Sequence, residues 1–186
     1  MRYDAVCDAV AAVRKRTDSV DPFTLCRELK ILLLARPLGK EPDAIKGFYY
    51  MNRRIKTITV NSDLPEVIQR IIIAHEIGHA ELHASRGINE FHDVGMFDES
   101  SAMEKEANLF AAEFQLNDSD VFEAMNSDTT FSGAAAILGV PMEVLDFKFR
   151  MMKWKGYKLI DPPIYTQGNY LRNFDMPKGE DDYYDC

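Results

Sequence analysis

The chain of 186 residues has no apolar run near the ~20 residues that a membrane-spanning helix needs. Its N-terminus mixes Arg2, Asp4 and Asp8 with apolar residues and therefore lacks a signal-peptide core. Both absences predict a cytoplasmic protein. The 3 cysteines have no metal or redox spacing, and Cys7 shares a predicted helix face with valines, so we expect packing rather than disulfides. The net charge of −8 argues against a general affinity for nucleic acid.

A hydrophobic content of 46% is enough for one core. We expect a single α+β domain over residues 1–156, followed by a loosely packed acidic tail over 157–186. Apolar periodicity and turn residues predict a small three-stranded sheet, with strands at 31–35, 48–51 and 54–60, the last two forming an antiparallel hairpin. The predicted helices span about 2–16, 21–30, 63–84, 102–116, 118–126, 131–138 and 141–155. Residues 85–100, with His92, are expected to form a surface loop.

The most informative stretch, residues 75–79, is His-Glu-Ile-Gly-His. On a helix, side chains four residues apart stack on one face, so His75 and His79 can reach one metal ion while Glu76 lies near a metal-bound water. This is the H-E-x-x-H pattern of zinc peptidases, in which the glutamate acts as general base. The alternative is a surface helix with two unrelated histidines.

The predicted helix around this motif supports the interpretation that the two histidines bind a metal ion. Asp63 and Glu66 have the spacing of a capping box, which predicts the start of the helix. An apolar stripe then includes His75 and His79, so both imidazoles are expected to face the core. The apolar members of the stripe are Val67, Ile68, Ile71 and Ile72. Two buried imidazoles need polar partners, and a metal ion satisfies both.

A catalytic zinc site usually has three protein ligands and an open position. Leu82 and Ser85 exclude the metzincin version, which needs glycine and histidine there. In the predicted helix 102–116, Glu106 points to the middle of the apolar side and is the expected third ligand. Glu113, two turns on, is a lesser rival or a residue that supports the ligands. Glu104 is expected on the solvated face.

With these features the chain resembles the ImmA/IrrE metallopeptidases of bacteria, phages and integrative elements. The resemblance rests on residues 55–61, on the extended motif 75–83 and on residues 106–111. It implies a zincin-like domain with one Zn²⁺ per chain, held by His75, His79 and Glu106, with Glu76 as the catalytic residue. It further implies a zinc endopeptidase whose substrate is a helix-turn-helix repressor, so that cleavage derepresses genes of a mobile element or stress response.

Other residues are candidates for supporting roles. His83 continues the histidine stripe, but one further turn adds about 6 Å, which favours a supporting or oxyanion-binding role over direct ligation. Tyr49 and Tyr50 are further oxyanion candidates, although strand aromatics are common. The strand before the zinc helix is expected to be an edge that pairs with an extended substrate. Its pairing residues would be Lys56, Thr57, Ile58 and Thr59.

Two other classes of function stay open beside the enzyme. Residues 132–158 can be read as a helix-turn-helix that binds DNA, yet its second helix is crowded with apolar residues, which favours a part of the peptidase fold. A catalytically silent metal-binding scaffold is the other class. The presence of Glu76 counts against it, because a scaffold needs no general base.

Overall fold

The computed structural model describes residues 2–83, 97, 99, 101–127 and 129–159. Its elements are α1 (Tyr3–Arg16), α2 (Pro22–Glu28), β1 (Ile31–Arg36), β2 (Gly47–Asn52), β3 (Ile55–Asn61), α3 (Glu66–Leu82), α4 (Ala102–Gln115), α5 (Asp118–Asn126), α6 (Phe131–Ile137) and α7 (Met142–Trp154). Each predicted helix and strand is therefore confirmed to within a few residues, and so is the mixed α+β class with a small sheet. The predicted loop at 85–100, with His92, and the tail from 160 onward lie outside the described residues.

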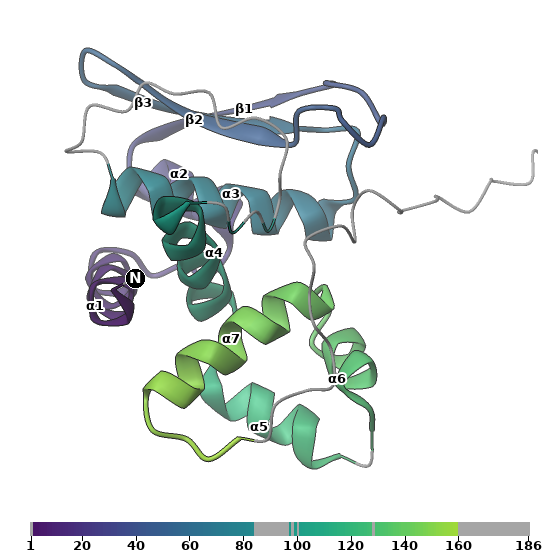
Figure 1. Cartoon of the computed structure of the whole chain (residues 1–186). Helices are drawn as coiled ribbons and strands as arrows, with labels where there is room; N and C mark the ends of the chain where they lie inside the picture. Colours follow the sequence, from purple (N-terminus) through teal and green to yellow (C-terminus); the bar gives the residue numbers. More distant parts are fainter. Residues whose placement is uncertain (1, 84–96, 98, 100, 128, 160–186) are drawn as a thin grey trace, which may run out of the picture.

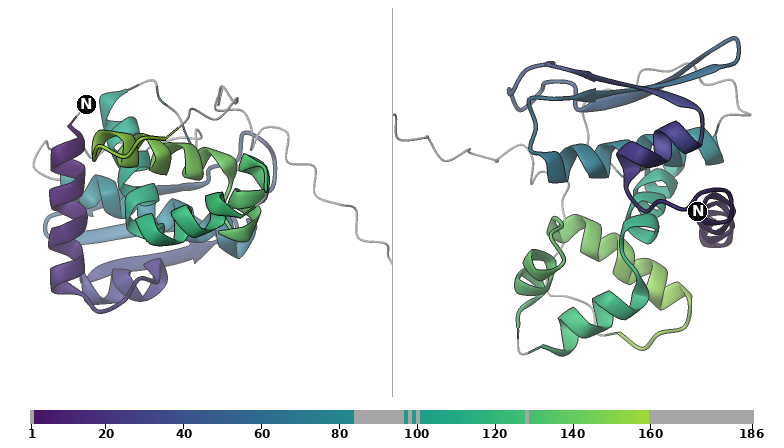
Figure 2. Two further views of the ribbon diagram at one scale, coloured as in Figure 1. Left: turned by 90° about the horizontal axis from the view of Figure 1, so that it is seen from below. Right: turned by 180° about the vertical axis from the view of Figure 1, so that it is seen from behind.

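The described helices lie on one side of the three-stranded sheet (Figure 1). Helix α3 runs beneath the strands, and α4 leads from α3 to the group formed by α5, α6 and α7. Seen from behind, α1 lies beside α4 (Figure 2), and the two helices are in contact. Helix α4 thus connects the sheet half of the molecule with the helical half.

Strand β3 is the central strand, because the order in the sheet is β1-β3-β2. It pairs in parallel with β1, from Ile31 opposite Lys56 to Arg36 opposite Asn61. On its other side it pairs antiparallel with β2, which confirms the predicted hairpin. The prediction that Lys56, Thr57, Ile58 and Thr59 form a free edge is therefore wrong, since all four have strand partners on both sides. Because β1 pairs in parallel with β3, the chain must cross over between them, and this crossover places the last strand between the first two. The local sequence pattern does not reveal it.

Helix α3 begins later than its predicted capping box. Glu66 is the first helical residue and Pro65 the N-cap, with no side-chain cap. The Asp63 carboxylate instead accepts a hydrogen bond from the Gly39 backbone N–H at 2.9 Å and so holds the preceding loop. Ile68, Ile71 and Ile72 are buried as predicted, whereas Val67 is 45% exposed.

A buried cluster of charges joins α4, α5 and α7. Lys148 is 1% exposed, and its Nζ lies 2.8 Å from Glu113 Oε2 and 2.6 Å from Asp118 Oδ1. Lys155 bonds the same two carboxylates. Burial alone would raise the pKa of Asp118, but the two ammonium groups outweigh it and lower that pKa. Lys148 and Lys155 thus stabilise the fold by binding carboxylates of α4 and α5.

The structure bears on the expected role of the cysteines and on the length of the helices. Cys7 and Cys26 are free thiols, and burial raises the pKa of Cys26 to about 12, as expected for packing residues. Within the described ranges, no helix combines the length and the apolar character needed to cross a membrane.

The charge cluster leads to a stability prediction. Lys148→Met should lower the free energy of unfolding by about 3 kcal/mol, the lower end of the cost of breaking a buried ion pair, because Lys155 still compensates Glu113 and Asp118. Lys15→Met on the exposed face of α1 is the matched control and should change it by less than about 0.5 kcal/mol. Urea unfolding measures both, and equal midpoints for the two variants would contradict the prediction.

Candidate metal centre

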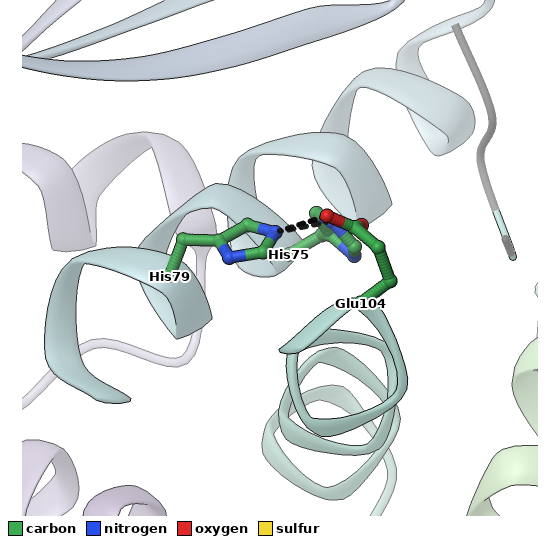
Figure 3. Close-up of side chains that lie close together, drawn as sticks. All are labelled: His75, His79 and Glu104. Carbon is green, nitrogen blue, oxygen red and sulfur yellow. Dashed lines mark hydrogen bonds and ion pairs between the residues drawn. The ribbon is translucent and has the colours of Figure 1, made fainter. Parts of the chain in front are cut away.

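His75 and His79 lie one turn apart on α3 and direct their rings toward α4 (Figure 3). Their Nε2 atoms are 3.0 Å apart. From α4, the Glu104 carboxylate reaches both, with Oε2 at 3.2 Å from His75 Nε2 and Oε1 at 3.5 Å from His79 Nε2. The three side chains are 11%, 2% and 14% exposed. Three groups from two helices therefore meet at one point.

A close approach of α3 and α4 makes this meeting possible. A Cβ atom added at Gly78 would lie 3.2 Å from the Cα atom of Ala107 and 3.1 Å from the Cβ atom of Phe110. Those distances are tighter than ordinary contact, so glycine between the two histidines allows α4 to pack against the motif. Because Glu104 lies three residues before Ala107, this contact also sets the position of its carboxylate.

The second ring nitrogen of each histidine has a buried partner. His75 Nδ1 lies 2.8 Å from Asn108 Oδ1, and His79 Nδ1 lies 3.1 Å from His83 Nδ1. Asn108 and His83 are 4% and 3% exposed. Both imidazoles are thus held on the side opposite to Glu104, which leaves Nε2 as the nitrogen at the common point.

The charges around the histidines favour a cation. Burial alone would lower the pKa of His75, but the hydrogen bond to Glu104 and the negative charges of Glu76 and Glu104 outweigh burial, so the pKa is raised. Glu76 is 3% exposed and follows His75 directly in α3. A site that stabilises a protonated imidazole offers the same negative field to a metal ion.

Glu106 does not occupy the place that the sequence analysis gave it. Its Oε2 lies 3.2 Å from His83 Nε2, and its Oε1 accepts a hydrogen bond from the Arg2 backbone N–H at 3.2 Å. The carboxylate that meets His75 and His79 belongs to Glu104, which was predicted to be solvated.

The misplacement of the two glutamates has a physical reason. The prediction rests on the bulky apolar side of α4 as the only inward side, yet every residue from Glu106 to Phe114 is buried, since α4 packs against α1, α3 and α7. Beside Phe110, the side that contacts α3 carries a stripe of small and polar residues. Glu104, Ala107 and Asn108, at positions i, i+3 and i+4, form this stripe, and that spacing was the signal for Glu104 and Asn108 in the sequence.

Of the remaining candidate residues, one contacts a histidine of the site and three lie elsewhere. His83 contacts His79, whereas Glu113 bonds Lys148 and Lys155 in the buried charge cluster. Tyr49 is buried on the face of the sheet that packs against α3, and its hydroxyl has no hydrogen-bond partner among the described residues. Tyr50, one residue on, points to the opposite face, where it lines a surface pocket of about 470 Å³ with Thr57.

The donor set fits a zinc ion. The candidate ligand atoms of His75, His79 and Glu104 all lie within 4.8 Å of one another. Two imidazoles and one carboxylate are one of the common ligand sets of catalytic zinc, which keeps a further position open. Nδ1 contacts like those to Asn108 and His83 are the usual support of metal-bound histidines.

Comparison with known proteins identifies relatives that match most of this chain. A Bacillus phage phi105 protein, described as uncharacterized immunity region protein 2, is 31% identical over 146 residues, which cover 78% of this chain and 90% of the relative. The metallopeptidase ImmA of Bacillus subtilis (strain 168) is 30% identical over 142 residues, which cover 75% and 80%. The model of the M78 peptidase family, described as the IrrE N-terminal-like domain, matches residues 26–150 and so includes α3 and α4. The resemblance seen in the sequence is thereby confirmed, and the chain belongs to this family.

Proposed function

We propose that the chain is a zinc-dependent endopeptidase with a zincin-like active site. His75, His79 and Glu104 would hold the metal, and Glu76 would act as general base. The observation that carries the proposal is the convergence of two Nε2 atoms, 3.0 Å apart, on the Glu104 carboxylate, directly beside a buried glutamate in the same helix. The family membership and the name of the Bacillus subtilis relative support the same class of enzyme.

The chemistry divides between the metal and the side chains. Bound zinc would supply a water of lowered pKa, near ~7, and a Lewis acid for the peptide carbonyl. Glu76 would accept a proton from the attacking water at its carboxylate and deliver that proton to the leaving amine. Asn108 and His83 would keep the two imidazoles in place while the charge changes.

The substrate is proposed to pair with β2 in an extended conformation. Since β3 is central, β1 and β2 are the outer strands of the sheet that the described residues form. Helix α2 packs against β1, whereas α3 packs against β2 and β3. Strand β2 is therefore the edge next to the helix that carries the histidines, and an edge strand accepts a chain that is already extended or locally unfolded.

We infer that the substrate is a helix-turn-helix repressor in the cytoplasm, whose cleavage derepresses genes of a mobile element or stress response. The name of the phage relative, which places it in an immunity region, supports this class of target. Repressors present basic surfaces, and the net charge of −8 can assist the encounter at low salt. No membrane partner is proposed.

The competing functions have less support. A DNA-binding role needs basic side chains free for phosphates, but Lys148 and Lys155 are bonded to Glu113 and Asp118. Arg150 is paired with Glu99 and Asp146. A silent metal-binding scaffold leaves the buried carboxylate of Glu76 beside the ligands without a role.

The first test is metal content. The purified chain should carry about one zinc, and Glu104→Gln should lose it, because the amide that replaces the carboxylate is a poor zinc ligand. Glu123→Gln, an exposed position on α5, is the control and should keep the metal. Elemental analysis that finds a full complement of zinc in Glu104→Gln would refute the ligand set.

The second test concerns the general base. Glu76→Gln should keep its zinc and its fold but lose peptide hydrolysis by at least ~100-fold, the usual contribution of a positioned base. The variant should also trap bound substrate. Cleavage by Glu76→Gln at the wild-type rate would show that the water is activated by another group.

The third test concerns the target. Wild type should cut a helix-turn-helix repressor encoded beside its gene within an extended segment, and Glu76→Gln should leave the repressor intact. Mass spectrometry maps the fragments. If the repressor stays intact while an unrelated unfolded protein is degraded, the chain is a general peptidase and the proposed regulatory role is wrong.

A further inference from the structure

A chain of hydrogen bonds runs from His79 to the N-terminal helix. His79 Nδ1 lies 3.1 Å from His83 Nδ1, and His83 Nε2 lies 3.2 Å from Glu106 Oε2. Glu106 in turn accepts from the Arg2 backbone N–H at 3.2 Å and lies 3.7 Å from the Arg2 guanidinium. His83 and Glu106 are 3% and 4% exposed, so water does not readily replace these contacts.

The direction of each bond in this chain follows from the groups at its ends. A carboxylate only accepts, so the hydrogen between His83 and Glu106 belongs to His83 Nε2. A neutral His83 that is protonated at Nε2 has a lone pair at Nδ1, and His79 must then donate its Nδ1–H. His79 Nε2 is thereby left with its lone pair, the form that binds a metal.

His75 reaches the same state by a separate route. Its Nδ1 lies 2.8 Å from the amide oxygen of Asn108, which accepts a hydrogen bond. Both lone pairs at Nε2 then point to the place where the two atoms are 3.0 Å apart. Each imidazole therefore has its own buried acceptor, and the acceptor of His79 depends on Glu106.

We propose that His83 and Glu106 are a positioning pair, in which Glu106 acts through His83 to fix the metal-binding tautomer of His79 and is not itself a ligand. The pair rests on the proposed zinc site. Arg2, at the start of α1, supports Glu106 from outside the residues 26–150 that the family model matches. The N-cap residue of α1 therefore contributes to the support of the site.

Zinc affinity of the full-length chain, measured by competition with a chromophoric chelator, tests the pair. Glu106→Leu and His83→Leu should each weaken zinc binding by about 10- to 100-fold, the usual effect of losing a group that supports a ligand. Glu106→Gln and His83→Asn keep an acceptor oxygen in the required place and should stay close to wild type. The double variant His83→Leu/Glu106→Leu removes both buried polar groups together, so it protects the fold and should be no weaker than the single variants.

Two results would overturn the pair. Loss of zinc from Glu106→Gln as complete as from Glu104→Gln would make Glu106 a direct ligand. If Glu106→Leu and His83→Leu both bind zinc with wild-type affinity, the contacts of His83 and Glu106 serve packing alone.

The ring ¹⁵N shifts of His83 give a readout that needs neither turnover nor metal. They should report a neutral ring protonated at Nε2 in wild type, with and without zinc, and a loss of that preference in Glu106→Leu. A His83 ring protonated at Nδ1 in wild type refutes the pair. A chain that binds zinc in this way but cuts no peptide would refute the proposed function alone, and the tautomer of His83 decides the pair even if wild type takes up no zinc.

Discussion

The contact between α3 and α4 at Gly78 is the constraint on which the candidate site depends. With 3.2 Å between a Cβ atom built at Gly78 and the Cα atom of Ala107, the two helices are close enough for short side chains to meet across them. Glu104 and Asn108 flank Ala107 on α4 and reach the histidines that flank Gly78 on α3. The glycine of the motif thus has a structural task that its spacing pattern alone does not reveal.

The burial of polar groups follows from the same contact. A buried polar atom left without a partner costs roughly 1–3 kcal/mol, so a core with two histidines needs acceptors placed around them. Asn108 serves His75, and His83 with Glu106 serves His79. Most of these side chains come from the facing helix or the next turn, which means that packing and hydrogen bonding are fixed together. Such a network holds the rings in one orientation before any metal binds.

Sequence reasoning succeeded where the signal is local. Helix periodicity, turn residues and the histidine spacing gave the elements and placed His75, Glu76 and His79 in one buried helix, as the structure has them. Prediction failed where the position of a residue or strand depends on a tertiary contact with a segment distant in the sequence. The central place of β3 requires the crossover from β1, and the choice of Glu104 over Glu106 requires knowing which side of α4 meets α3.

The prediction of the start of α3 failed for a related reason. Asp63 has the spacing of a helix cap, yet it bonds the Gly39 backbone because the loop before the sheet hairpin passes next to it. Competition between a local partner and a distant one is decided by the tertiary structure. The same holds for Glu113, whose place on α4 gave no sign of Lys148 in α7 and Lys155 at the end of α7, which both bind it.

A crystal structure of the zinc-loaded chain, with anomalous diffraction data at the zinc absorption edge, tests the central claim most directly. The account predicts one anomalous peak bonded to His75 Nε2, His79 Nε2 and the Glu104 carboxylate, with Glu106 bonded to His83. A peak bonded to Glu106, or a zinc-loaded crystal with no peak beside α3, would contradict it.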